Sequence, residues 1–193
     1  MIRLAAEADL PQILAIYGPF IETTTHTFEY AVPTLEEFTP RFRAITAQFP
    51  WLVWEEEGRV LGYTNGSAPY VRAAFSWCAE VSVYLAPEAQ GRGVGRRLYT
   101  ALEKLLVLQG YRVIYAIVTD ENEGSLSFHK ALGYREIARL PRCGVKFGRW
   151  CGVVYLEKRL EIGEIPSNLP ESFLSIVNND RKFAKILDIL SLS

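Results

Sequence analysis

A glycine-rich turn between a predicted strand and a predicted helix is the clearest chemical feature of the sequence. The turn runs Gln90-Gly91-Arg92-Gly93-Val94-Gly95-Arg96 and opens a strongly amphipathic segment. The first N–H groups of a helix have no partner within the helix and lie at the positive end of its dipole, and glycines let a ligand approach them closely. The turn therefore predicts an anion site suited to a diphosphate, to which Arg92 and Arg96 could add charge-assisted contacts.

Two common nucleotide sites that use such a turn are disfavoured. A P-loop has Gly-Lys followed by Ser or Thr, whereas Gly95 is followed here by Arg96 and Arg97. The dinucleotide fingerprint is G-x-G-x-x-G near the start of a parallel βαβ unit, whereas this G-x-G-x-G run follows three predicted strands. The pattern therefore argues against both a nucleoside triphosphate and a nicotinamide cofactor.

The turn and a second motif together resemble the GNAT superfamily of N-acetyltransferases. Gln90, Gly93 and Gly95 fill the family signature Q/R-x-x-G-x-G/A. The run Asn122-x-x-Ser125-x-x-Phe128-His129-x-x-x-Gly133-Tyr134 resembles the family's next helix, which lies alongside the pantetheine arm of acetyl-CoA. Two signatures in the right order, with one predicted strand between them, make a coincidence improbable.

Within that superfamily, residues 1–160 resemble the phosphinothricin and methionine sulfoximine acetyltransferases. The resemblance rests on Thr27-Phe28-Glu29, Ala79-Glu80-Val81-Ser82-Val83-Tyr84, Leu98-Tyr99, His129-Lys130-Ala131-Leu132-Gly133-Tyr134 and Val145-Lys146-Phe147-Gly148-Arg149-Trp150. It implies an α/β GNAT fold, with a mixed, mostly antiparallel sheet flanked by helices. It also implies acetyl-CoA as cosubstrate, a small amino-acid-like amine as acceptor, and a homodimer.

Two other functions remain open. One is acetylation of a different amine, such as a polyamine, an aminoglycoside or a protein N-terminus. The sequence has no acidic run near residues 27–29, which argues mildly against a polycationic acceptor. The other is a non-catalytic module that binds acyl-CoA. Retention of both Glu80 and His129 argues against a module that only binds.

The resemblance places the acetyl-CoA contacts on three segments. Backbone groups of Val83, Tyr84 and Leu85 would bind the acetyl and pantetheine groups. The diphosphate would lie on the turn, and Asn122 would lie beside the arm. The turn positions are Gly91, Arg92, Gly93, Val94, Gly95 and Arg96.

Glu80 is the candidate general base for acetyl transfer. Strand alternation places it on one face with Cys78, Ser82 and Tyr84, and a carboxylate in mid-strand is costly unless it is paired or faces a cleft. An aliphatic amine with a pKa near 10 is neutral in only about one molecule in a thousand at pH 7, so a base assists attack. The alternative is a structural ion pair across the sheet.

Three further residues are candidates by resemblance. Many family members have a tyrosine at the position of His129, as the acid for the departing thiolate, while the resembled subfamily has histidine; His129 could fill that role or be structural. Phe28 and Glu29 lie where the family places an acceptor-binding loop. One departure concerns the family's Trp-x-Asp, which is Trp150-Cys151-Gly152 here, so the acceptor specificity is expected to differ.

The elements that must position these residues follow from hydrophobic periodicity and turn signals. Strands are expected at 2–5, 51–55, 60–67, 77–85, 113–118, 134–140 and 152–160, the last two flanking a turn-rich connection with Gly144 and Gly148. Helices are expected after an Asp9 cap and at 34–49, 91–109 and 122–132. We divide the chain into a GNAT domain at 1–160 and a linker with a tail helix at 161–193; packing on its own domain is favoured for that helix, and a subunit contact is the alternative.

Composition excludes several partners. With 21 basic and 22 acidic residues the formal net charge is −1, so no global field attracts nucleic acid. No apolar run approaches the ~18 residues of a membrane span. Three cysteines without C-x-x-C spacing favour a reducing compartment and no metal. We therefore expect a cytoplasmic enzyme with no nucleic-acid or membrane partner.

Overall fold

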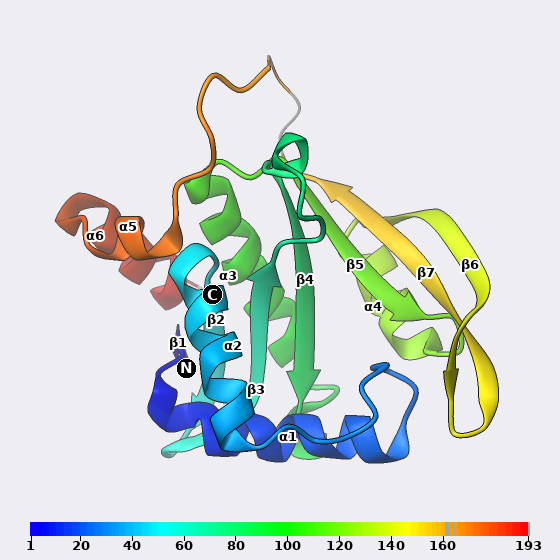
Figure 1. The fold of residues 1–193 in the computed structure, drawn as a ribbon. Coiled ribbons are helices and arrows are strands. Elements are labelled where there is room, and N and C mark those ends of the chain that lie inside the picture. Colours follow the sequence, from blue (N-terminus) through cyan, green and yellow to red (C-terminus); the bar gives the residue numbers. More distant parts are fainter. Residues whose placement is uncertain (161–162, 164, 193) are drawn as a thin grey trace.

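A mixed sheet forms the centre of the molecule (Figure 1). The computed structural model describes residues 1–160, 163 and 165–192. These residues form seven strands in the order β1-β2-β3-β4-β5-β7-β6, in which β4 and β5 are parallel and all other neighbours are antiparallel. The strands are β1 (Ile2–Leu4), β2 (Trp51–Glu56), β3 (Arg59–Ser67), β4 (Cys78–Leu85), β5 (Val113–Thr119), β6 (Arg135–Lys146) and β7 (Arg149–Arg159). The expected α/β class and mostly antiparallel sheet are confirmed.

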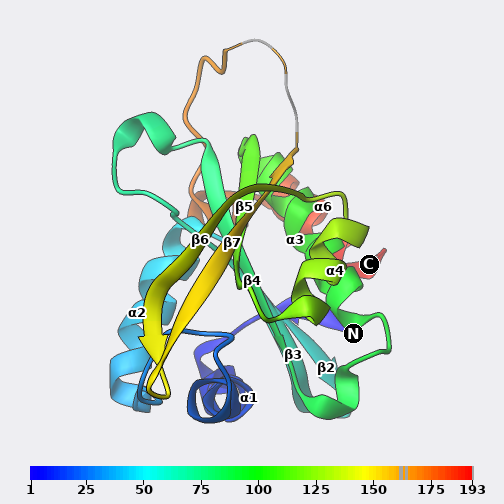
Figure 2. The ribbon, with the colours of Figure 1, turned by 90° about the vertical axis from the view of Figure 1, so that its right-hand side faces the viewer.

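Helices cover both faces of the sheet (Figure 2). The helices are α1 (Leu10–Thr23), α2 (Leu35–Gln48), α3 (Val94–Gln109), α4 (Glu123–Ala131), α5 (Phe173–Val177) and α6 (Asp180–Ser191). Helices α1 and α2 bury one apolar cluster against β2 and β3, while α3 buries the larger cluster on the opposite face. The stripe predicted for the third helix is buried as expected, and Thr34 caps α2 by accepting the Glu37 N–H.

The central parallel pair of strands separates along its length. Ladder pairing between β4 and β5 covers only Cys78, Ala79 and Glu80 on β4. Strand β4 nevertheless continues to Leu85 and β5 to Thr119, and Figure 1 shows the two strands diverging. Beyond Glu80, one edge of β4 therefore has β3 as its partner and the other edge has no strand partner among the described residues.

The last two strands are longer than the sequence pattern predicted. Strands were expected at 134–140 and 152–160 with a turn-rich connection, but β6 and β7 form one hairpin that turns only at Phe147 and Gly148. Irregularities in register, including one between Leu140 and Gly144, interrupt the alternation that periodicity analysis needs. Gly144 therefore lies within a strand rather than in a turn.

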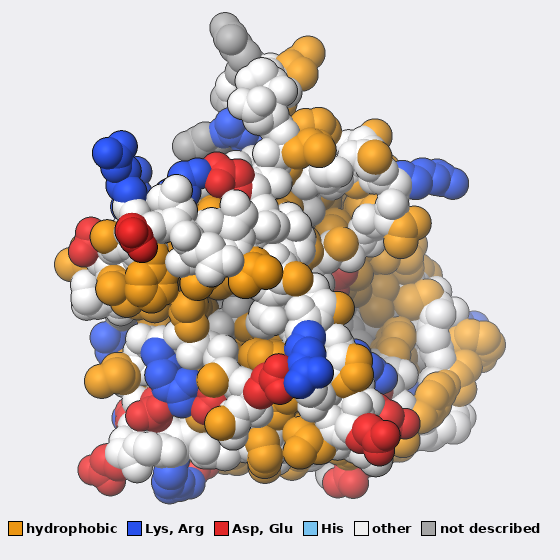
Figure 3. Space-filling view, turned by 60° about the vertical axis from the view of Figure 1, so that its left-hand side comes forward, with side chains coloured by type: hydrophobic (Ala, Val, Ile, Leu, Met, Phe, Trp, Pro, Cys, Tyr) orange, Lys and Arg blue, Asp and Glu red, His pale blue; other side chains and the backbone are white. Residues whose placement is uncertain are grey.

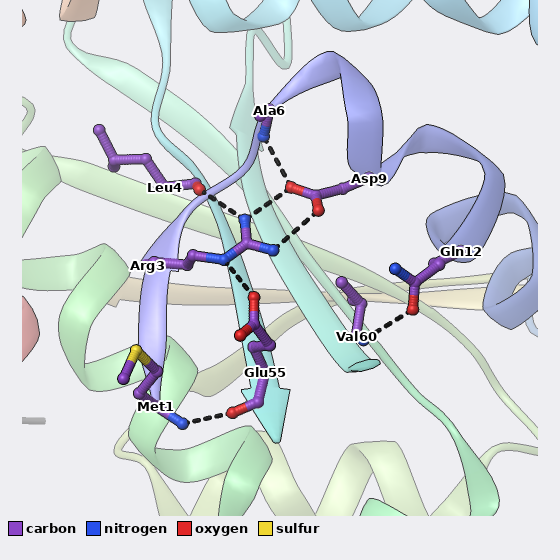
Figure 4. Close-up of polar contacts among 8 residues, drawn as sticks. All are labelled: Met1, Arg3, Leu4, Ala6, Asp9, Gln12, Glu55 and Val60. Atoms are coloured by element: carbon purple, nitrogen blue, oxygen red, sulfur yellow. Dashed lines mark hydrogen bonds and ion pairs between the residues drawn. The ribbon is translucent and has the colours of Figure 1, made fainter. Parts of the chain in front are cut away.

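The N-terminal strand is fixed to the sheet by Arg3 (Figure 4). Its guanidinium contacts both Asp9 oxygens at 2.7 and 2.8 Å and Glu55 at 2.6 Å. The Asp9 carboxylate also accepts the Ala6 N–H at 2.8 Å. The expectation that Asp9 caps the first helix through its side chain is therefore wrong, because Arg3 and the preceding turn hold that carboxylate.

The C-terminal helices pack on the body of the molecule, at the end away from the β6–β7 hairpin (Figure 1). Phe173, Ile176 and Ile186 are buried, and α5 and α6 contact α2, α3 and β1. Residues 161, 162, 164 and 193 of the expected tail lie outside the described residues. Helices α5 and α6 therefore belong to the apolar core on the α3 side of the sheet.

Charged side chains are interspersed on the face drawn in Figure 3, in keeping with the near-zero net charge. At the surface, Arg43 forms an exposed ion pair with Glu7. Within the described ranges, no helix has the length and apolar character needed to cross a bilayer.

Candidate active site

A cleft of about 440 Å³ opens where β4 and β5 separate. Its walls come from the end of α1, from β4, from the glycine turn with the first turns of α3, from β5 and from α4. The lining residues are Phe20, His26, Val81, Ser82, Val83, Tyr84, Leu85, Gln90, Gly91, Gly95, Tyr99, Ala116, Ile117, Val118, Asn122, Gly124, Ser125, Phe128 and His129. Seven of the fourteen residues predicted for the site line this cleft: Val83, Tyr84, Leu85, Gly91, Gly95, Asn122 and His129. The other seven do not line it: Glu80, Arg92, Gly93, Val94, Arg96, Phe28 and Glu29.

The glycine turn has the geometry of an anion site. Gly91 and Gly93 have φ of 71° and 78°, a left-handed region that side chains disfavour, and α3 begins directly after Gly93. A Cβ on either glycine would meet no atom within 4 Å, so the turn faces open space. Arg92 is held by Glu56 at 2.6 Å, whereas Arg96 is exposed. The unpaired N–H groups at the start of α3 are therefore available to donate to an anion.

Backbone groups of Val83, Tyr84 and Leu85 can bind a ligand because one edge of β4 lacks a strand partner at this point. The Tyr84 ring contributes to a core cluster as well, with centroids 4.8 Å from Tyr17 and 5.4 Å from Tyr63. This strand edge can therefore pair with the amide groups of an extended ligand, as a further strand would.

Asn122 caps the helix that forms the opposite wall. Its Oδ1 accepts the Ser125 N–H at 3.1 Å, which fixes the start of α4 beside β5. Asn122 also lines the cleft. Its place beside the arm of the cofactor stays a prediction.

Glu80 lies where the two parallel strands begin to separate. Ala79 and Val81 are buried towards α3, so alternation directs Glu80 to the face that carries α1 and α2. No hydrogen bond or ion pair to its carboxylate is found among the described residues, and burial raises the pKa of Glu80. A partly desolvated carboxylate without a cation is a competent proton acceptor at neutral pH.

His129 and Tyr99 form a hydrogen-bonded pair on the α3 side of the cleft. The His129 ring has Nδ1 2.8 Å from the Ser125 carbonyl oxygen and Nε2 3.0 Å from the Tyr99 hydroxyl. Burial lowers the pKa of His129, which keeps the imidazole neutral at neutral pH. A carbonyl oxygen only accepts, so the single ring proton resides on Nδ1, and Nε2 accepts from Tyr99.

The segment 24–34, here called the acceptor loop, packs on the tip of the β6–β7 hairpin. Lys146 donates to the Thr27 carbonyl oxygen at 2.7 Å, and Tyr30 donates to the Val145 carbonyl oxygen. The Phe28 ring covers Gly144, where a Cβ would lie 2.5 Å from the ring. Phe28 is thereby held at the hairpin.

Glu29 faces the helices rather than the cleft. Its carboxylate is bound by Arg41 at 3.0 Å and by the Tyr17 hydroxyl at 3.3 Å. Neither Phe28 nor Glu29 lines the cleft described above.

The glycine that departs from the family pattern leaves room for another carboxylate. A Cβ on Gly152 would lie 2.3 Å from Asp120 Oδ2, and the Gly152 N–H donates to Asp120 Oδ1 at 3.3 Å. Asp120 therefore fills the space beside Gly152 from the neighbouring strand end.

Sequence reasoning missed two residues that line the cleft. His26 is exposed, and its ring lies 6.0 Å from that of Phe20 at the cleft wall. Tyr99 was noted only as part of a family mark. A tyrosine on the buried stripe of a helix needs a partner for its hydroxyl, and that signal could have identified it. Among the described residues, no three metal-ligating side chains cluster.

Comparisons with known proteins agree with this geometry. A family model described as an acetyltransferase (GNAT) domain matches residues 2–154. Phosphinothricin N-acetyltransferase of Alcaligenes faecalis is 37% identical over 172 residues, covering 88% of this chain and 86% of that protein. The L-methionine sulfoximine/L-methionine sulfone acetyltransferase of Pseudomonas paraeruginosa is 33% identical over 162 residues, covering 83% and 94%.

A solved structure has the same architecture. The GNAT superfamily phosphinothricin acetyltransferase of Sinorhizobium meliloti, in complex with acetyl-CoA, aligns with a TM-score of 0.81 at 32% identity. The alignment covers 89% of this chain and 92% of that one. Sequence and fold therefore lead to the same group of proteins.

Proposed function

Because the chain belongs to the GNAT acetyltransferase family, we propose that it transfers acetyl from acetyl-CoA to the free amine of a small amino-acid-like acceptor. The acceptor class, of the phosphinothricin or methionine sulfoximine type, is supported by the names of the relatives. The observation that carries the proposal is the cleft, in which an unpaired edge of β4 leads directly to the glycine turn.

The residues present fit acetyl-CoA. The open edge of β4 can bind the amides of the pantetheine arm, the start of α3 can bind the diphosphate, and Asn122 shapes the facing wall. When bound, the cosubstrate supplies a thioester carbonyl that an amine can attack. The chain must then remove a proton from the amine and stabilise the departing thiolate.

Glu80 accepts the amine proton, directly or through water. Support comes from its place at the separation of the strands, from its partial burial, and from the lack of a cationic partner among the described residues. A carboxylate paired in a structural ion pair would have a lowered pKa, whereas burial raises the pKa of Glu80.

His129 assists the departing thiolate from the other face of β4, through the Tyr99 hydroxyl to which it is hydrogen-bonded. Phe28 forms part of the acceptor end of the site, and Glu29 fixes the loop that carries it through Arg41. In this arrangement, the base and the group that assists the thiolate stand on opposite sides of one strand.

The enzyme acts in the cytoplasm as a homodimer. Its cysteines are free thiols in the described structure, which suits a reducing compartment. The exposed apolar side chains on the β6–β7 hairpin support a contact between copies; they are Ile137, Leu140, Val145, Phe147 and Trp150.

The test is thiol release from acetyl-CoA, followed with a chromogenic thiol reagent. The amine panel contains methionine sulfoximine, phosphinothricin, ordinary amino acids, a polyamine and an aminoglycoside. Turnover with the sulfoximine or phosphinothricin and not with the polyamine or aminoglycoside supports the proposed acceptor class. Binding of acetyl-CoA without turnover on any amine would contradict it and favour a non-catalytic module.

A further inference from the structure

The hydroxyl of Tyr99 stands between two acceptors at the inner wall of the cleft. Its oxygen lies 3.0 Å from His129 Nε2 and 3.4 Å from the Val81 carbonyl oxygen. The side chain is only 1% exposed, yet it lines the cleft together with Val81 and His129. A buried tyrosine that only needed a partner would be satisfied by either acceptor alone.

The imidazole itself has no proton to offer to the cleft. His129 Nδ1 donates a hydrogen bond to the Ser125 carbonyl oxygen, and Nε2 accepts a hydrogen bond from the Tyr99 hydroxyl. Of this hydrogen-bonded pair, the member with a proton to donate is therefore the Tyr99 hydroxyl. A neutral thioester sulfur is a weak acceptor and leaves the Tyr99 hydroxyl hydrogen-bonded to Nε2, whereas a thiolate is a charged acceptor that competes strongly for this hydrogen bond.

Resting on the proposed function, we infer that the Tyr99 hydroxyl is the group that donates a hydrogen bond to the departing thiolate, and that His129 positions this hydroxyl. The thioester C–S bond breaks with its electron pair going to sulfur. The Tyr99 proton stays on its oxygen and is shared with the sulfur, and the thiolate takes up a proton from solvent after it leaves. The bond is stronger in the transition state than in the ground state, which is the condition for catalysis.

The matched control lies in the same aromatic cluster. Tyr134 is also buried, with its ring centroid 6.2 Å from that of Tyr99, but its hydroxyl donates to Glu103 and it does not line the cleft. Tyr99→Phe and Tyr134→Phe each remove one buried hydroxyl and keep the ring. A general effect of loosening this cluster would appear in both variants.

The experiment measures binding of CoA and of desulfo-CoA, which lacks the thiol, by titration calorimetry above the pKa of a free thiol, about 8.5. We expect Tyr99→Phe to weaken CoA binding by about 10- to 100-fold, as for a hydrogen bond to a charged group, and to leave desulfo-CoA binding unchanged. Tyr134→Phe should change neither affinity. Ultraviolet absorbance of the thiolate should show a lowered thiol pKa for CoA bound to the wild type and an ordinary one for Tyr99→Phe.

Several outcomes would overturn the inference. An ordinary thiol pKa for CoA bound to the wild type does so without any variant, and so does equal loss of CoA and desulfo-CoA affinity in Tyr99→Phe. Wild-type protein that binds neither ligand would refute the proposed function itself. Wild-type protein that binds both equally would leave the cofactor site intact and refute only the role of Tyr99.

Discussion

The two halves of the site are built in different ways. The proposed cofactor half consists of one edge of β4, the glycine turn, and the starts of α3 and α4. Most of its binding groups are backbone N–H and C=O groups, presented by elements that follow one another between residues 78 and 131. Its chemistry is therefore encoded locally, by glycines and by helix starts.

The proposed acceptor half is assembled from segments far apart in the sequence. The acceptor loop is held to the β6–β7 hairpin by the Lys146 contact with Thr27 and by the Phe28 ring on Gly144. A further hydrogen bond joins Thr25 to Glu121 at 2.8 Å. Substrate choice can therefore change through loop contacts while the cofactor half stays constant.

The largest effect is expected from Glu80→Gln, which should lower kcat by about 10²- to 10⁴-fold with little change in acetyl-CoA binding. The exposed Glu36→Gln on α2 is the control. Wild-type kcat/KM should rise with pH as Glu80 loses its proton, with a midpoint above the 4.5 of an ordinary glutamate. If kcat/KM of Glu80→Gln still rose over the same pH range, another group would be the base.

The ionised carboxylate of Glu80 should also lower the free energy of unfolding. Burial raises the pKa of Glu80 above 4.5, so the folded protein holds this proton at pH values where the unfolded chain has lost it. Stability is then lost as the pH rises from 4.5 through the folded pKa. The midpoint temperature of thermal unfolding should accordingly be higher for Glu80→Gln than for the wild type at about pH 7. Below the pKa of the unfolded chain, the two midpoints should be equal.

The next effect concerns the cofactor half alone. Gly93→Ala should raise the Kd for acetyl-CoA by about 10-fold or more, because a Cβ would enter the space in front of the helix start. Gly58→Ala is a matched control, since Gly58 also has positive φ and open space around its Cβ. Both should lose about 1–2 kcal/mol of stability. Gly93→Ala should leave the turnover of acetylpantetheine unchanged, because this substrate lacks the diphosphate. If that turnover fell as well, the effect of the substitution would not lie in binding of the diphosphate.

The different construction of the halves explains what could be predicted from the sequence. Gly91, Gly93 and Glu80 could be proposed as site residues because local strand, turn and helix patterns surround them, and Asn122 was proposed from the family resemblance of its helix. Their roles stay predictions. The bond from Lys146 to Thr27 spans 119 residues, and no periodicity reports it.

The β6–β7 hairpin was also misjudged, because its irregular register disguises two long strands as a turn-rich connection. Asp120 was missed for a similar reason: the space it fills is left by a glycine on another strand.

Gly152→Ala tests this tertiary complementarity through stability. The new Cβ would lie 2.3 Å from Asp120 Oδ2 and 2.9 Å from the Leu140 carbonyl oxygen, so we expect a loss of about 1–3 kcal/mol in the free energy of unfolding. Adding Asp120→Ala should recover part of it, because the backbone contact remains. Gly124→Ala, whose Cβ meets nothing closer than 3.8 Å, is the control for urea denaturation. An additive double variant would show that the two positions are not coupled.

The smallest effect is expected from Lys146→Met, and it separates the halves most directly. Lys146 is only 2% exposed, and burial lowers its pKa, so the ammonium is retained at a cost in desolvation. Methionine keeps the packing volume and removes the hydrogen bond to Thr27, so the acceptor loop should lose one of its attachments. The KM for the acceptor found in the amine panel should then rise by about 2- to 10-fold, as expected for one hydrogen bond, while the Kd for acetyl-CoA stays constant. Arg43→Gln, which breaks only an exposed pair with Glu7, should change neither value. If Lys146→Met weakened acetyl-CoA binding instead, the hairpin would support both ligands, and the acceptor half could not vary independently of the cofactor half.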